Sequence, residues 1–267
     1  PVRCATFDLP GLLPAGGYTW HAITCAAGAA ATQSATWFSH TTAPWSFAPV
    51  LSPGEGDLLL YTGSSGSAQT VIDGERAQLG EGAIYSHVGV CLGFGQWNAG
   101  TAVFTPGVAN PAADTDGAIY VAEMLAGGLT VRPLSESVAD AEQVHIYRHR
   151  AIGTTGAAVA RNAVAHYPTP YAFEQLTTLA MLNMQTIPAA FEAQLARVDA
   201  SAGGVQKMIC SEHARRALAE AGLDPAVSPW PAAVEHGVWT TAERQFDYTT
   251  PNMLALSPTF MKLGAAK

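Results

Sequence analysis

The sequence has very little lysine and no long hydrophobic run. Lysine occurs only at positions 207, 262 and 267, and the formal net charge of the 267 residues is −8. A surface of this sign repels the phosphates of nucleic acids and anionic lipids, so we expect no nucleic-acid partner. A transmembrane helix needs about 18 or more consecutive apolar residues. No such run occurs, and we therefore expect a chain that does not cross a membrane.

Charged residues are also scarce, at 13%, whereas 48% of the residues are hydrophobic. This balance excludes a disordered, highly charged protein. The length is sufficient for a full hydrophobic core in one large domain or two small ones. The sequence begins at Pro1 without a start methionine or a visible signal peptide, which leaves open whether a leader has been removed.

Only four cysteines are present. Cys4 and Cys25 lie in the N-terminal stretch and could form a disulfide if the protein is exported to an oxidising compartment. The alternative is two unrelated buried cysteines. Cys91 and Cys210 lie inside segments predicted to be regular secondary structure, which favours free thiols.

The N-terminal stretch differs in composition from the rest of the chain. Residues 1–53 are rich in small residues and contain three of the six tryptophans, at positions 20, 37 and 45. A solvated tail carries few aromatic residues. We therefore predict that residues 1–53 form an extension packed on the main domain, and that residues 54–267 form this domain.

Strands are predicted first along the main domain, and helices afterwards. Short apolar segments bounded by turn residues predict strands at 56–63, 83–93, 118–125, 129–134 and 143–150, with loops at 64–80 and 93–117. Helical periodicity predicts helices at 155–167, 171–184, 188–200, 210–222 and 250–257. This order indicates an α+β fold.

Cys210 lies at the start of the helix predicted at 210–222. It shares an apolar face with several alanines, and the opposite, charged face carries Glu212, Arg215, Arg216 and Glu220. The free N–H groups and the dipole at a helix N-terminus favour an anion, which lowers the pKa of a thiol there. Buried cysteines are also common as small apolar residues, so the helix alone leaves both roles open.

Two residues in the predicted strands could act with a thiolate. Alternation places His87 on one strand face with Tyr85, Gly89 and Cys91, although a lone histidine in a strand is ordinarily structural. Glu123 alternates with apolar residues onto a face expected to be buried, and a buried carboxylate needs a partner. A carboxylate that orients a histidine beside a nucleophile is the arrangement of a catalytic triad.

Six segments in this order resemble the permuted members of the NlpC/P60 superfamily, the YiiX/YaeF-like papain-fold cysteine hydrolases. The segments are GDLLLYTG, YSHVGVCLG, YVAEMLAGGLTVRPLSE, YPTPYAFEQL, MICSEHARRAL and TTPNMLALSP. The histidine strand precedes the cysteine helix, as in the permuted group. The resemblance covers about residues 54–260, and residues 1–53 have no counterpart in it.

The resemblance implies a circularly permuted papain-like fold, in which a small antiparallel sheet or barrel packs on the helix that carries the cysteine. It implies Cys210 as the nucleophile, His87 as the general base and Glu123 as the orienting residue. Tyr171 and Tyr85 are candidates for lining the pocket or donating to the oxyanion, with packing as the alternative. No cofactor or metal is implied.

The implied activity is hydrolysis of an amide bond in bacterial cell-wall peptides, which favours an exported, periplasmic or secreted location. One alternative is a lipid acyl hydrolase or acyltransferase similar to lecithin:retinol acyltransferase, and another is a non-catalytic binding module. His213, one helical turn after Cys210, could replace His87 as the base or bind a metal with Cys210. His145 and His149 are interpreted as surface or structural residues.

Overall fold

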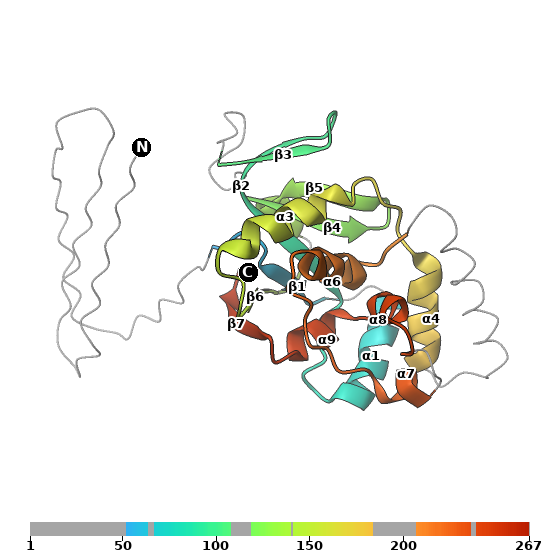
Figure 1. Cartoon of the computed structure of the whole chain (residues 1–267). Coiled ribbons are helices and arrows are strands. Elements are labelled where there is room, and N and C mark those ends of the chain that lie inside the picture. Colours follow the sequence, from blue (N-terminus) through green and yellow to red (C-terminus); the bar gives the residue numbers. More distant parts are fainter. Residues whose placement is uncertain are drawn as a thin grey trace, which may run out of the picture. The chain divides into compact units, whose positions relative to one another are not determined.

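The computed structural model describes residues 52–63, 67–107, 119–139, 141–183, 207–235 and 239–266 (Figure 1). These residues belong to one compact unit, Val50–Lys267. Nearly all of the predicted extension at residues 1–53, including Cys4 and Cys25, lies outside this part of the chain, as does the helix predicted at 188–200. The predictions for these segments remain predictions.

An open antiparallel sheet forms the centre of the domain. Its order is β5-β4-β2-β1-β6-β7, and β3 pairs with the far end of β2. The strands are β1 Leu58–Tyr61, β2 His87–Asn98, β3 Val103–Pro106, β4 Ile119–Leu125, β5 Gly128–Pro133, β6 Val144–His149 and β7 Phe260–Ala265. The five strands predicted from the sequence all lie in this sheet.

The helices are α1 Ser67–Leu79, α2 Leu134–Ala139, α3 Gly156–Ala165, α4 Phe173–Asn183, α6 Cys210–Glu220, α7 Pro231–Glu235, α8 Ala242–Asp247 and α9 Pro251–Leu256, with a 3-10 turn at Gly153–Thr155. Most helices follow strand β6, in line with the α+β prediction, whereas α1 and α2 lie between strands and β7 comes last. Four of the predicted helices correspond to α3, α4, α6 and α9. No helix in the described part of the chain is long and apolar enough to cross a membrane.

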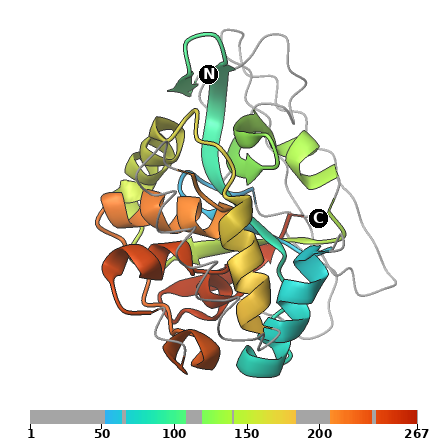
Figure 2. The same ribbon diagram turned by 90° about the vertical axis from the view of Figure 1, so that its right-hand side faces the viewer.

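The two faces of the sheet pack differently because alternate residues of each strand point to opposite sides. Leu58 and Leu60 of β1 belong to the main core with α3 and α6, whereas Leu59 and Tyr61 pack with Val121 and Ile146 on the other side. Alanines on α3 and α6 allow these helices to approach each other and the sheet closely. Both views show α3 beside α6, and α1 beside α4 (Figures 1 and 2).

The prediction of a loop at 64–80 is wrong, because this segment contains α1. Ile72 and Glu75 are both buried, and Leu79 packs against a core cluster that also contains residues of α4. These positions share one face of a helix, but a glutamate in the middle of that face weakens the apolar periodicity. Packing on α4 therefore outweighs the polar character of the segment.

The loop predicted at 93–117 is also wrong in its first part. Strand β2 continues to Asn98 and turns back into β3, with Trp97 opposite Phe104. Asn98 accepts hydrogen bonds from the N–H groups of Gly100 and Thr101 and so forms the turn. Strand β7 was not predicted at all; it forms the sheet edge by pairing with β6.

The charged face of α6 is not a solvent face. Arg215 is buried and donates hydrogen bonds to Asp224 and to the carbonyl of Gln245 in α8. Glu212 is buried too, and it accepts a hydrogen bond from Gln175 of α4 at 3.0 Å. Helical periodicity separates the two faces of α6 correctly, but it does not reveal that α4 and α8 cover the polar face.

Candidate active site

Cys210 is the first residue of α6 and its side chain lies at the sheet. Ile209 before it has an extended backbone, with φ −93° and ψ 168°, so the helix begins abruptly at the cysteine. Met208 forms an isolated parallel β-bridge with Tyr171, which holds in place the segment that leads into the helix. Only 5% of Cys210 is exposed. The N–H groups of Val88 and Ser211 donate hydrogen bonds to its sulfur.

His87 is the first residue of β2 and lies between a sulfur and a carboxylate. Its Nε2 is 2.9 Å from Oε2 of Glu123, and its ring centroid is 5.1 Å from that of Tyr61. The imidazole also forms a hydrogen bond with Cys210. Because Nε2 is bound to Glu123, Nδ1 is the ring nitrogen that is left for the thiol. The side chain is 22% exposed, so a substrate can reach it.

Glu123 is fully buried on β4, as alternation predicted, and it has two partners. One is His87, and the other is Arg132 of β5, whose Nε donates to Oε1. Burial alone would raise the pKa of Glu123, but hydrogen bonds and charges from His87 and Arg132 outweigh it and hold the pKa below its usual value. The carboxylate is therefore ionised at neutral pH.

Arg132 was not predicted from the sequence as a partner of Glu123. In the sheet it pairs with Val121, so it lies diagonally next to Glu123 on the same face. The alternation of β4 and of β5 is visible in the sequence, but the register between them is not. Knowledge of the register between β4 and β5 would have identified Arg132 as a neighbour of Glu123.

Cys210 and His87 stabilise each other's charged forms. Burial would raise the pKa of the Cys210 thiol, but the charge of His87 and the hydrogen bonds to the sulfur lower it overall. Burial also opposes the imidazolium form of His87, yet the negative charge of Cys210 and hydrogen bonds to Cys210 and Glu123 raise the pKa of His87 to about 10. Both shifts favour a thiolate–imidazolium pair over a neutral thiol and imidazole.

Gly89 lies where Val121, Tyr61 and Glu123 pack closely against the backbone of β2. A Cβ at this position would be 2.7 Å from Cγ1 of Val121, 3.3 Å from the hydroxyl of Tyr61 and 3.4 Å from Cβ of Glu123. The first distance is shorter than carbon atoms tolerate, and Val121 is a buried β-branched residue that cannot turn away freely. The sheet face that carries Glu123 is thus closely packed at Gly89.

We expect Gly89→Ala to lower the free energy of unfolding by about 1–3 kcal/mol, the usual cost of overpacking a core. Urea denaturation measures the change. Gly127→Ala is the matched control, because Gly127 is exposed and a Cβ there meets nothing within 4 Å. Equal stability of the two variants would contradict the close packing of Val121 and Glu123 around Gly89.

The two tyrosine candidates have different positions. Tyr171 lies beside Cys210, since burial and the negative charge of this cysteine raise the pKa of its hydroxyl. Tyr171 therefore remains a donor. Tyr85 was placed on the face of His87, which is wrong: it precedes β2 and packs with the main core. Its hydroxyl is within 2.9 Å of both His145 Nδ1 and Tyr147.

Asn252, at the start of α9, holds the segment that leads into His87. Its Oδ1 accepts from the N–H of Tyr85 at 2.8 Å, and its Nδ2 donates to the carbonyl of Tyr85 at 2.9 Å. The same Nδ2 donates to Glu75 of α1. The helix around Asn252 was predicted, but its role was not, because no local pattern indicates a contact between residues so distant in the chain.

His213, His145 and His149 do not take part in the pair. His213 is fully buried and its Nε2 donates to the carbonyl of Ala163; burial lowers its pKa to about 4, so it is neutral. The suggestion that it acts as the base is therefore not supported by its position. His145 and His149 are buried rather than on the surface, which leaves the structural interpretation.

One group of three acidic side chains in the described ranges could in principle hold a cation. It consists of Glu212, Glu243 and Asp247. Arg216 already lies among them: it donates to Glu212 at 2.7 Å and to Glu243, and is 3.7 Å from Asp247. The guanidinium neutralises these carboxylates, so we assign no metal to them.

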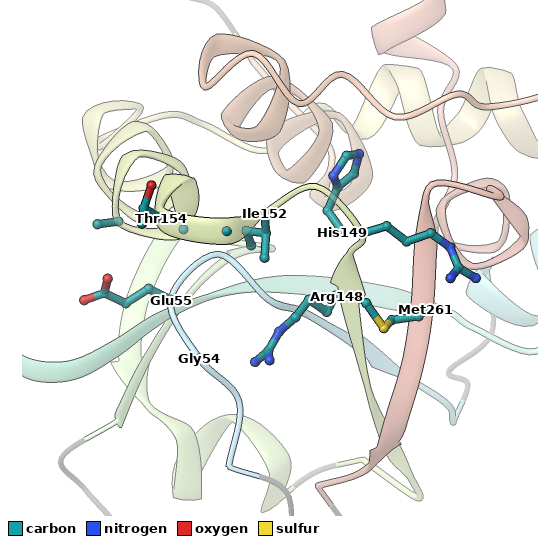
Figure 3. Close-up of a pocket in the computed structure, with 11 residues that line it drawn as sticks. Gly54, Glu55, Arg148, His149, Ile152, Thr154 and Met261 are labelled. Atoms are coloured by element: carbon teal, nitrogen blue, oxygen red, sulfur yellow. The ribbon is translucent and has the colours of Figure 1, made fainter.

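A small cavity of about 70 Å³ lies directly beside Cys210 and is also lined by Tyr171, Tyr85 and Glu75. A larger hollow of about 530 Å³ lies elsewhere, between Glu55, the end of β6 and the start of α3 (Figure 3). None of Cys210, His87 and Glu123 lines it. Its Arg148 points toward Gly54 and is paired with Asp57 at 2.6 and 2.7 Å.

Comparison of the sequence with models of known protein families finds no match, and neither does comparison with curated proteins. The candidate site therefore depends on its own geometry: a cysteine at a helix N-terminus, a histidine in contact with it, and a buried carboxylate behind the histidine.

Proposed function

We propose that this chain is a cysteine hydrolase in which Cys210 is the nucleophile, His87 the general acid and base, and Glu123 the orienting residue. The observation that carries the proposal is the convergence of these three side chains, which come from α6, β2 and β4. Three residues this distant in sequence have no common structural reason to meet, whereas nucleophilic catalysis needs all three together. For the same reason a catalytic role is favoured over a binding module.

In the proposed mechanism, the Cys210 thiolate attacks the acyl carbon and the carbonyl electrons move to oxygen. The N–H of Cys210 and the hydroxyl of Tyr171 are the proposed donors to this oxyanion. When the tetrahedral intermediate collapses, the bond to the leaving amine breaks and Nδ1 of His87 gives the amine its proton. A thioester on Cys210 remains. Water then attacks it while His87 accepts the water's proton, which releases the acid and restores the thiolate.

We further propose that the domain is a permuted NlpC/P60-type, papain-like fold. The order of the triad along the chain, His87 then Glu123 then Cys210, supports this assignment, as do the antiparallel sheet and the packing of α6 on it. The resemblance of six ordered sequence segments points the same way. In this assignment residues 54–267 are the catalytic domain.

The proposed substrate class is an amide in a bacterial cell-wall peptide. The cavity beside Cys210 has room for only a few non-hydrogen atoms, which suits a short acyl group. A fatty acyl chain, as in the lipid alternative, needs a much longer apolar channel. The size of the cavity therefore favours the amide over the lipid ester.

Products identified by mass spectrometry test the proposal. We expect the protein to cleave the stem peptides of purified muropeptides, and the same reaction in H₂¹⁸O to place one heavy oxygen in the new carboxylate. Phospholipid vesicles form the second arm, and the Cys210→Ala variant is the control in both. Lyso-lipid or an acylated acceptor would favour the lipid alternative. Equal products from wild type and variant would contradict the proposed nucleophile.

A further inference from the structure

The cavity beside Cys210 is small, and the ionisable side chains that line it are all acidic groups. Besides the thiol, its ionisable side chains are Glu75 and the two tyrosines, Tyr85 and Tyr171. Among the described residues that line it there is no lysine, arginine or histidine. The remaining lining is largely aliphatic and comes from α1, α4 and the segments before α6 and α9. Such a cavity repels an anion and attracts a cation.

Glu75 is a buried carboxyl group with unused bonding capacity. It is 1% exposed and projects from α1 into the interface with α9. Asn252 donates to its Oε2 at 2.5 Å, whereas its Oε1 is buried without a hydrogen-bond partner within the described ranges. Burial raises the pKa of Glu75 to about 7, and the neighbouring side chains of Thr250 and Asn252 oppose this shift only in part. An unpartnered buried carboxylate is costly, and a bound donor would relieve that cost.

Hydrogen bonds of Asn252 connect Glu75 to the segment that leads into His87. Asn252 binds Glu75 with the same amide that clamps the backbone of Tyr85, two residues before His87. Glu75 is therefore linked to the strand that carries the catalytic histidine, and it lines the same cavity as the sulfur. Glu75 thus combines an unpartnered oxygen with a place in the lining of this cavity.

We infer that this cavity binds a small aliphatic amine of the substrate's acyl group in its ammonium form, with Glu75 as the counter-ion. The inference rests on the proposed function, because it takes Cys210 as the atom to which the acyl group becomes attached. A cavity of about 70 Å³ holds only a few atoms, so the amine lies within a few bonds of the acyl carbon. The enzyme thus selects short aminoacyl groups over neutral ones of equal size.

Two thiol reagents of equal shape test this inference without requiring turnover. 2-Aminoethyl methanethiosulfonate and propyl methanethiosulfonate differ only in an ammonium for a methyl group. In both reactions the Cys210 thiolate attacks the reagent's sulfur, a disulfide forms and methanesulfinate leaves. The rates are followed at mildly alkaline pH by mass spectrometry of the peptide that contains Cys210. The ratio of the two rates does not depend on the fraction of Cys210 present as thiolate, because the same sulfur attacks both reagents.

In Glu75→Gln we expect the ratio of the cationic to the neutral rate to fall by about tenfold or more, the usual range for one close charge pair. Glu81→Gln is the matched control: Glu81 is an exposed residue just after α1, and its loss changes the net charge equally. We expect it to keep the wild-type ratio. Circular dichroism checks that Glu75→Gln is folded, and Glu75→Asp, which retains the charge, is expected to retain most of the preference.

An unchanged ratio in Glu75→Gln, with rapid reaction of the neutral reagent, would overturn the inference and leave the proposed function intact. An equal fall of the ratio in Glu81→Gln would also overturn it, because the effect would then be one of overall charge. If Cys210 reacts no faster than buried Cys91 with either reagent, the proposed function fails and this inference fails with it.

Discussion

Cys210→Ala is expected to reduce hydrolysis by about 10⁴-fold or more, because loss of a nucleophile removes the covalent pathway entirely. His87→Ala is expected to cause a loss of similar size. The thiolate would then lack its cationic partner, and the leaving amine its proton donor. The two losses are not expected to add in the double variant, since both residues serve one chemical step. Initial rates on the substrate identified by mass spectrometry give these values.

Cys91→Ala is the matched control for the cysteine variant. Cys91 is fully buried in β2, and burial raises the pKa of its thiol to about 12, so it is not a nucleophile. Its replacement removes a small apolar group and is expected to reduce stability slightly while activity is retained. Residual activity of Cys210→Ala close to that of Cys91→Ala would show that another residue carries the reaction.

Glu123→Gln is expected to reduce activity by about 10²- to 10⁴-fold through the tautomer of His87. Arg132 can only donate, so the glutamine must turn its carbonyl oxygen toward Arg132 and its NH₂ group toward His87. Nε2 of the imidazole then has to accept a hydrogen bond, and the proton moves to Nδ1. The nitrogen that faces Cys210 can no longer take a proton from the thiol.

If the tautomer of His87 causes the loss of activity, removal of the guanidinium at position 132 should restore activity in part. In Glu123→Gln/Arg132→Met the amide is free to turn its oxygen toward His87, and we expect activity to recover in part. The double variant also avoids a guanidinium that has lost its carboxylate partner, which by itself destabilises a protein. Thermal unfolding of both variants separates stability from catalysis. An equal or lower activity of the double variant would contradict the tautomer mechanism.

The strands and helices could be predicted where one face is apolar and the period is regular. Glu123 is the clearest case, because a carboxylate among Ile119, Val121 and Leu125 can only be a buried group that needs partners. The helix start at Cys210 was predicted in the same way. The burial of Glu123 and the α+β class are confirmed.

The remaining features depend on contacts between distant segments. Arg132 requires the register between β4 and β5, Asn252 requires the packing of α9 against the start of β2, and Glu75 lies in a helix whose polar residues resemble a loop. The error at Tyr85 has a similar origin. Alternation holds only from His87, where the strand begins, and Tyr85, two residues earlier, packs in the main core on the other side of the sheet.

The pH dependence of Cys210 alkylation by iodoacetamide tests most directly whether sulfur and imidazole form an ion pair. Labelling is followed separately at Cys210 and Cys91 by mass spectrometry. The account predicts that Cys210 reacts with a midpoint well below about 8.5, the value for a free thiol, while Cys91 resists labelling. In His87→Ala the midpoint should return to that of an ordinary or buried thiol. An ordinary midpoint for Cys210 in the wild type, or one that His87→Ala leaves in place, would contradict the account.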